Sequence, residues 1–341
     1  MQTKATNSGR LHRQLRDELA RAGCFRRAPM RSVLLGAFIL ASYGSAYAVL
    51  LTSPSPGLRA VALAALAFIS VQAGFLAHEA GHGAITRNRR LAAWIGQVFN
   101  TLLTALCFSY FSHIHRQHHP HTNERARDPD MQSAFFSMYP QSAAAKRGLG
   151  ALISRHQGVL IWVLVSLQGF SLKIDSLAYL RDHPRTTRAD QAMLLGHIAL
   201  WLIVPIPVLG FADALLNYAL MTLAIGPYLG VIFLVNHIGT RAIGPDEPVP
   251  FLEHELSVTR NVGAGPVQDF FFGGLNNHIE HHLFPAMPTA RLALARRVTR
   301  EFCRSRGLAY REMSWLEAAR EVTAHFKAMS AFVPVHGRRG A

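Results

Sequence analysis

Residues 32–58 read SVLLGAFILASYGSAYAVLLTSPSPGL, and none of them is charged. The run is long enough to cross a bilayer, which takes about 20 apolar residues in a helix. The cluster 54–57, Pro-Ser-Pro-Gly, predicts a turn near its end, and a second uncharged run, 60–77, follows at once. We therefore expect these two runs to form a transmembrane helical hairpin.

Four further runs lack Lys, Arg, Asp and Glu. The runs 191–212 and 214–240 meet at Asp213 and predict a second transmembrane hairpin. The run 157–172 is short for a span, so we expect it to lie along the membrane surface. The run 91–114 contains several polar residues, which favours a segment that lies in the interface or dips into the membrane and returns.

Composition supports a membrane protein. The chain has 341 residues, of which 50% are hydrophobic and only 16% are charged, against about a quarter charged in typical soluble domains. Such a composition excludes a disordered chain. The net charge of +15 suits an anionic membrane surface or nucleic acid, and the apolar runs favour the membrane, so no nucleic-acid partner is expected. Three scattered cysteines without a CxxC motif argue against a disulfide framework.

Basic residues predict which side of the membrane each segment faces, because cytoplasmic loops carry an excess of Lys and Arg. The first 31 residues carry eight, and the segment between the hairpins carries many more, whereas the two tight turns carry only Arg59. We expect an all-α, multi-pass protein of the cell membrane with four transmembrane helices in two hairpins, interfacial helices and a cytosolic helical cap. Its N-terminus and C-terminus would be cytoplasmic. The expected divisions are a basic arm (1–31), a membrane domain (32–310) and a cytosolic tail (311–341).

Eight of the 18 histidines lie in three short clusters: HEAGH at 78–82, HRQHH at 115–119 and HIEHH at 278–282. Helix positions three and four apart share a face, so each cluster presents several imidazoles to one point. Imidazole suits iron, zinc, copper and nickel. Eight ligands exceed the four of one tetrahedral zinc, so the pattern predicts two metal ions that share a site on the cytoplasmic side.

The clusters can meet only if the run 91–114 returns to the side from which it starts. A single crossing would place His115 about 30 Å from His82, across the hydrocarbon core. A metal centre built from both clusters therefore requires the segment not to cross.

These residues resemble an integral-membrane fatty acid desaturase. The motifs HEAGH at 78–82, HRQHHPHTN at 115–123 and GGLNNHIEHHLFPAMP at 273–288 fit the family's histidine boxes, and the resemblance runs from roughly residue 35 to 310. The family also carries an imidazole after its last span, which Asn-His-Ile-Gly at 236–239 resembles. The ligands that the resemblance implies are His78, His82, His115, His118, His119, His237, His278, His281 and His282.

The resemblance implies a non-haem centre of two irons with O2 as co-substrate. The implied reaction introduces a double bond into a fatty acyl chain carried on coenzyme A or a lipid. Electrons would come from a separate carrier, such as ferredoxin with its reductase. Carboxylates and amides near the clusters are candidates to orient the imidazoles through their other ring nitrogen. They are Glu79, Asn123, Asp128, Asp130, Asn236, Asp269 and Glu280, whereas His113, His121 and His254 are expected to lie outside the site.

Three alternatives stay open at this point. A di-iron membrane hydroxylase shares the scaffold and differs in its product. The cluster at 78–82 also fits H-E-x-x-H of zinc metalloproteases, with Glu79 as general base, but that motif needs one further ligand and leaves two clusters unexplained. A metal transporter would line a path inside its spans, whereas these clusters gather at the predicted ends of the spans.

Overall fold

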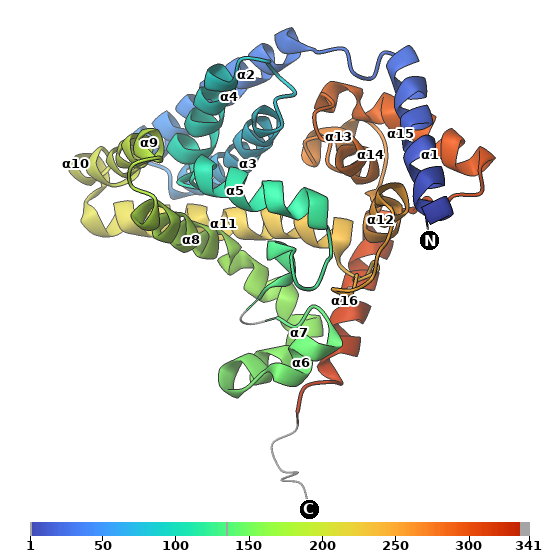
Figure 1. The fold of residues 1–341 in the computed structure, drawn as a ribbon. Coiled ribbons are helices and arrows are strands. Elements are labelled where there is room, and N and C mark those ends of the chain that lie inside the picture. The colour runs from blue at the N-terminus through green and yellow to red at the C-terminus, as the bar shows by residue number, and fades with distance from the viewer. Residues whose placement is uncertain (1, 134–135, 335–341) are drawn as a thin grey trace, which may run out of the picture.

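The computed structural model describes residues 2–133 and 136–334, and it is predominantly helical (Figure 1). The helices of the first half are α1 (Gln2–Arg21), α2 (Pro29–Thr52), α3 (Pro56–Gly81), α4 (Arg89–Gly96), α5 (Phe108–His118), α6 (Pro140–Ala145) and α7 (Gly148–Leu164). Those of the second half are α8 (Gln168–Asp182), α9 (Arg188–Ile198), α10 (Ile206–Leu209), α11 (Phe211–His237), α12 (Phe251–Val258), α13 (Pro266–Phe271), α14 (His278–Leu283), α15 (Thr289–Ser305) and α16 (Trp315–Ser330). Two short strands, β1 (Asn261–Val262) and β2 (Glu312–Met313), pair in parallel.

The first predicted hairpin is present as α2 and α3, which pack along each other. Ser55 caps α3 by accepting a hydrogen bond from the backbone N–H of Leu58, and Pro56 occupies the first helical position, where its missing N–H costs nothing. The second hairpin is present as α9, α10 and α11. Gly210 joins α10 to α11 with a φ of +84°, a conformation that glycine adopts without a steric penalty.

The segment 91–114 folds back on itself, as the convergence of the histidine clusters requires. After α4 it forms a π-helical turn (Gln97–Leu102), then reverses near Ala105, whose φ is +60°. Gly96 lies against the ring of Phe108, so close that a Cβ at position 96 would sit 2.3 Å from it. The end of α4 therefore packs directly on the start of α5, and the segment is not a single continuous helix.

The segment around 157–172 differs most from the sequence-based picture. There α7, a 3₁₀ turn (Val165–Leu167) and α8 make one helical stretch of 35 residues, Gly148–Asp182. The charged residues that bracket the uncharged run lie inside this stretch: Arg155 donates to the carbonyl of Pro334, and Lys173 donates to the hydroxyls of Tyr218 and Thr222. Arg and Lys are good helix formers, so the helix continues through both positions.

Among the residues that the structure describes, five helices are long and apolar enough to cross a membrane by length and composition, whereas four were expected. They are Pro29–Thr52, Pro56–Gly81, Gly148–Asp182, Arg188–Leu209 and Phe211–His237. Large apolar side chains on these helices are exposed, among them Val61, Leu195 and Phe211, each about two-thirds exposed. Such side chains suit contact with lipid, which identifies a multi-pass membrane protein; the four-span arrangement stays a prediction.

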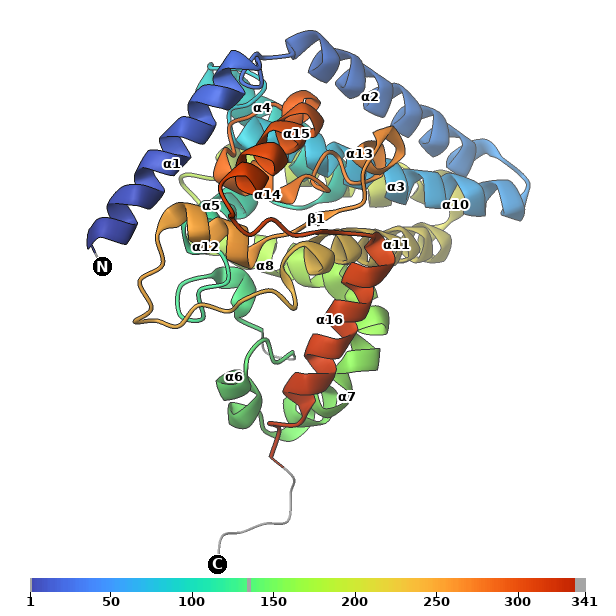
Figure 2. The same cartoon turned by 90° about the vertical axis from the view of Figure 1, so that its right-hand side faces the viewer.

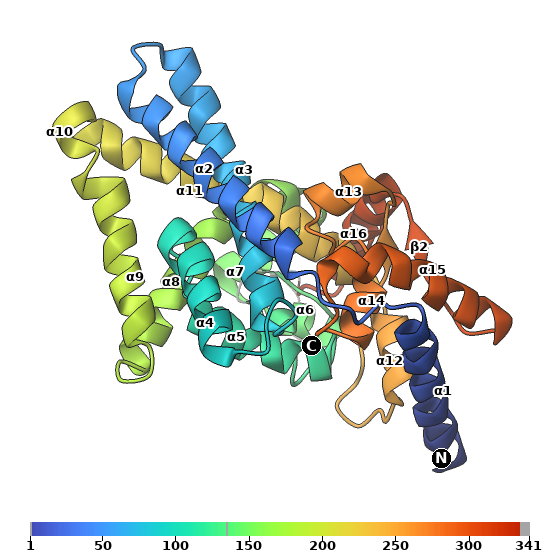
Figure 3. The same cartoon turned by 90° about the horizontal axis from the view of Figure 1, so that it is seen from above.

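Helices α1, α12, α14 and α15 gather at one end of the molecule, opposite the α2–α3 turn and α10 (Figure 3). There α1 packs with α12, α14 and α15 around a buried apolar cluster that includes Leu15, Leu19, Ile279 and Leu283. Figure 2 shows α1 alongside these helices and α16 alongside α7. The predicted basic arm thus contains a helix that contributes to the apolar core beside the third histidine cluster.

Candidate metal centre

All nine predicted histidines lie where the ends of four helices meet. His78 and His82 stand at the end of α3, the 115–119 cluster at the end of α5, and His237 is the last residue of α11. The 278–282 cluster forms most of α14. Seven of the nine side chains are buried, and His82 and His115 are partly buried. The fold-back of 91–114 brings His115 beside His82, with 2.9 Å between their Nε2 atoms.

Five imidazoles form a first group: His78, His82, His115, His119 and His281, whose ring nitrogens lie within 4.8 Å of one another. The Nε2 of His115 is 2.9 Å from that of His78, 2.9 Å from that of His82 and 3.0 Å from that of His119. A ring nitrogen carries either one proton or one lone pair, so it can form a hydrogen bond with only one of these three partners. Several lone pairs converging on one point fit a cation between them.

A second group lies beside the first and contains His118, His237 and His282, with ring nitrogens again within 4.8 Å. His278 joins it, because its Nε2 lies 2.7 Å from that of His237. The Nε2 atoms of His281 and His282 are buried without a hydrogen-bond partner. A buried polar atom is costly when unpaired, so these nitrogens also point to ligation. The side chains present therefore fit two metal ions.

Burial keeps most of these rings in the form that binds metal. It lowers the pKa of His82 to about 4, with a smaller contribution from His118. It also lowers the pKa values of His115, His119, His278, His281 and His282. A metal ligand must be a neutral imidazole, and a lowered pKa holds the ring neutral at pH 7.

His118 is the exception, because two carboxylates face its ring. Burial acts to lower its pKa, but Asp130 and Asp128 outweigh burial and raise the pKa to about 9. The Nδ1 of His118 lies 3.0 Å from Asp128 and 3.3 Å from Asp130. Asp128 is itself held by the backbone N–H of Asn123, at 2.7 Å. These carboxylates stabilise a positive charge on the ring of His118. A metal ion bound to the ring could supply that charge in place of a proton. Both were expected to orient an imidazole, and both are placed to do so.

His282 has two neighbours that sequence reasoning missed. The hydroxyl of Thr122 lies 3.1 Å from its Nδ1, and a carboxylate oxygen of Glu255 lies 3.2 Å from the same nitrogen, without the alignment of a hydrogen bond. Burial raises the pKa of Glu255 to about 8. Glu255 stands on α12, where no motif marks it; the only signal was an acidic residue beside His254 in the predicted cap.

The other orienting candidates bind elsewhere. Glu79 accepts a hydrogen bond at 2.9 Å from the backbone N–H of Thr289, at the start of α15, and Glu280 accepts from Asn261 and Tyr310. The side-chain amides of Asn123 and Asn236 donate to backbone carbonyls, and Asp269 accepts from Asn276 and Asn277. His113, His121 and His254 belong to neither group of imidazoles; His254 bonds the carbonyl of Thr122 instead.

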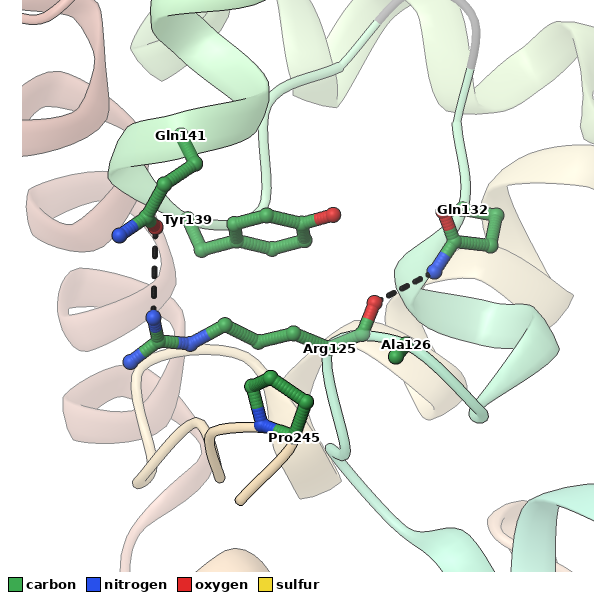
Figure 4. Close-up of a pocket in the computed structure, with 6 residues that line it drawn as sticks. All are labelled: Arg125, Ala126, Gln132, Tyr139, Gln141 and Pro245. Atoms are coloured by element: carbon green, nitrogen blue, oxygen red, sulfur yellow. Dashed lines mark hydrogen bonds between the residues drawn. The ribbon is translucent and has the colours of Figure 1, made fainter. Parts of the chain in front are cut away.

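An open pocket of about 450 Å³ lies beyond the second histidine cluster (Figure 4). Its lining consists of Arg125, Ala126, Gln132, Tyr139, Gln141 and Pro245. Figure 4 shows the guanidinium of Arg125 directed to Gln141, with Gln132 bonded to the carbonyl of Arg125. None of the nine histidines lines this pocket, so it is separate from the candidate metal centre.

Comparison with known proteins agrees with this site. The family model described as fatty acid desaturase matches residues 52–314, which is more than half of the chain and includes all three histidine clusters. The chain is 24% identical to Delta(8)-fatty-acid desaturase of Borago officinalis and 25% identical to Delta(8)-fatty-acid desaturase 1 of Arabidopsis thaliana, in each case over 90% of this chain and 72% of the relative. It is 28% identical to fatty acid desaturase 3 of Bos taurus, over 80% of this chain and 62% of the relative. A buried histidine centre at the ends of membrane helices and a family match that spans it lead to one conclusion: this chain belongs to the fatty acid desaturase family.

Proposed function

We propose that the nine histidines hold two iron ions and that the protein uses them to introduce a double bond into a fatty acyl chain. The observation that carries this proposal is the arrangement around His115, whose Nε2 faces three other imidazole nitrogens within 3.0 Å. Protons cannot satisfy such a contact, whereas a metal ion does. The second group, around His237 and His278, supports a second ion.

Iron is favoured over zinc by the chemistry of the substrate. The hydrogens of a methylene are not acidic, and no protein side chain removes them, so a redox-active metal must supply this step. The overall reaction balances as –CH2–CH2– + O2 + 2 electrons + 2 H+ giving –CH=CH– + 2 H2O. Two of the four electrons that reduce O2 come from the acyl chain, and an external donor supplies the other two.

The protein would supply ligand geometry and a dry site. Asp128 would orient the ring of His118 and Thr122 that of His282, with the carboxyl group of Glu255 beside the same nitrogen. Burial excludes water from the imidazoles and keeps those other than His118 neutral. We further propose that the metal site faces the cytoplasm with both termini, in the cell membrane, as the Lys and Arg distribution predicts. The acyl chain would be carried on coenzyme A or a lipid.

The test is expression in a host that lacks its own desaturase, followed by mass spectrometry of the lipids with derivatisation of double bonds. The wild type should produce an unsaturated acyl chain, and labelled dioxygen should leave the lipid unlabelled. His115→Ala should abolish the product. His113→Ala is the matched control two residues away, because that exposed ring contacts Gln117 and Tyr179 and belongs to neither group of imidazoles. A labelled hydroxylated lipid as the main product would assign the chain to hydroxylation instead.

Metal analysis tests the iron assignment separately. Purified wild-type protein should contain about two irons per chain, since two groups of imidazoles are present. One zinc and no iron would contradict the proposal.

A further inference from the structure

We propose that a groove between α7 and α16 binds one anionic phospholipid, with the headgroup held by two cations of α16. The α7–α16 groove is open, has a volume of about 360 Å³ and is lined by Trp162, Leu316, Ala319, Arg320, Thr323, Ala324 and Lys327. It shares no residue with the two groups of imidazoles or with the pocket around Arg125. The inference therefore goes beyond the proposed function and concerns a second site.

The groove arises because α16 is amphipathic and packs on the protein by one side. Ala318, Val322 and Phe326 recur every four residues along α16 and are fully buried. At about 100° per residue, the groove residues of α16 occupy the arc of the helix next to this buried stripe. The helix therefore presents one face to the protein and, directly beside it, one wall of the groove.

The other wall belongs to α7, which α16 crosses at close range. The indole N–H of Trp162 donates to the hydroxyl of Thr323 at 2.9 Å, and this hydroxyl donates to the carbonyl of Ala319 at 3.0 Å. A Cβ at Gly158 would sit 2.5 Å from the Cγ of Lys327, so the stem of Lys327 lies across α7 at this glycine. The polar atoms of the floor thus bond one another and leave the groove's binding capacity to its cations.

The two cations of the groove are available to an anion. Arg320 and Lys327 are exposed, and within the described residues neither forms an ion pair. The acids of α16 are engaged elsewhere: Glu317 caps the start of the helix, and Glu321 pairs with arginines outside the groove. Guanidinium and ammonium groups bind phosphate oxygens, and basic residues at a membrane surface attract anionic lipids.

An apolar stripe on α7 adjoins the groove and suits the acyl chains of the same lipid. Leu149, Leu152, Val159 and Val163 are between 53% and 65% exposed, and they lie within an arc of about 80° on the helix. Val159 precedes Trp162 by three residues, so the stripe runs beside the groove. A phospholipid matches both the cations and the stripe, whereas a soluble phosphate compound matches the cations alone.

The packing of α16 places the groove at the depth of lipid headgroups. Ala318 shares a buried apolar cluster with Val235, and Val322 shares another with Ile238. These partners lie on either side of His237, the last residue of α11. The ends of membrane helices lie near the headgroups. Figures 1 and 2 show α7 and α16 side by side at the edge of the molecule, where lipid can reach them.

The test counts the lipids that the purified full-length protein retains, by native mass spectrometry from a neutral detergent. The protein is titrated with phosphatidylglycerol or with phosphatidylcholine of the same acyl chains. The wild type should retain one phosphatidylglycerol at about tenfold lower concentration than phosphatidylcholine. The double variant Arg320→Gln, Lys327→Gln should lose this preference, since each basic residue near an anionic surface contributes about a factor of five. The matched control Arg13→Gln, Arg16→Gln removes the same charge from exposed positions on α1 and should keep the preference within about twofold.

A further variant separates the groove from general attraction by positive charge. Ala324→Trp fills the groove but keeps both cations, so it should lower the retention of phosphatidylglycerol while the melting temperature stays unchanged. Equal retention of the two lipids by the wild type, or full preference in the double variant or in Ala324→Trp, would overturn the proposal. So would an equal loss in the matched control, or displacement of phosphatidylglycerol by excess coenzyme A. Retention is measured without turnover, so failure here leaves the proposed desaturation untouched.

Discussion

Removing the carboxylate of Asp128 should weaken the metal centre, although Asp128 belongs to neither group of imidazoles. Its side chain is fully buried and lies 3.0 Å from the Nδ1 of His118 and 2.7 Å from the backbone nitrogen of Asn123. Asp128→Asn keeps the size of the side chain but removes its charge. A hydrogen bond to a charged group contributes about 1.5–3 kcal/mol. That range corresponds to about 10–100-fold in metal affinity, which is also the usual effect of losing the partner of a metal-bound histidine.

Asp130 offers the matched control, because it faces the same nitrogen at 3.3 Å but its side chain is 59% exposed. Water screens such a pair, and exposed ion pairs contribute about 0–1 kcal/mol, so Asp130→Asn should cost less than about fivefold. The measurement is the iron retained per chain against increasing chelator concentration, with a thermal melt of each variant to verify folding. Equal loss of iron from the two variants, or full retention by folded Asp128→Asn, would refute the orienting role.

Three further changes test the site and the fold around it. His237→Ala removes the nitrogen 2.7 Å from His278. The group of His118, His237, His278 and His282 should then lose its metal ion, and desaturation should fall by about 10²-fold or more. His254→Ala should keep its iron, and equal iron contents in the two variants would contradict the assignment. In iron-free protein, the free energy of unfolding should fall as pH drops from 6.5 towards 4. Burial lowers the pKa of His82 in the folded protein to about 4, so in this range the unfolded chain binds more protons than the folded one. A melting temperature that is constant between pH 7 and 5 would contradict this. Gly273→Ala should destabilise the fold by about 1–3 kcal/mol, since its φ is +57° and a Cβ would sit 2.3 Å from Phe75. Gly44→Ala should leave the stability unchanged, because nothing lies within reach of a Cβ at that position. Equal melting temperatures of the two variants would refute the clash.

The histidine clusters made the centre predictable because their spacing follows the helical repeat. Imidazoles three and four residues apart must share a helix face, and two such helices cannot bind one metal pair unless the segment between them returns. Sequence therefore predicted both the convergence and the fold-back of 91–114. It did not predict how the rings divide: His115 and His119 join the first group, whereas His118 between them joins the second. The spacing of the histidines does not predict which rings share a group. That depends on where α11 places His237 and where α14 places His281 and His282.

Other features escaped prediction for a different physical reason. The uncharged run 157–172 is short for a span, but Lys173 at its end donates to hydroxyls on α11 and the helix continues past it. Glu255 could not be recognised because its role depends on α12 packing against α14, a contact between segments without a shared motif. The amphipathic character of α1 was hidden by its arginines, which dominate its composition, although Leu15 and Leu19 mark its buried side.

The centre also depends on the second hairpin through a residue outside every histidine cluster. The carboxylate of Asp190, on α9, is fully buried and accepts hydrogen bonds from the hydroxyl of Thr101, at 2.6 Å, and from the backbone N–H of Phe108, at 3.0 Å. These donors stand on either side of the reversal near Ala105. A buried carboxylate is stable only when hydrogen bonds compensate it, so α9 and the two arms of the reversal must assemble together. The reversal in turn places His115 beside His82. The position of His115 relative to the histidines of the first hairpin therefore depends on a buried contact with the second hairpin.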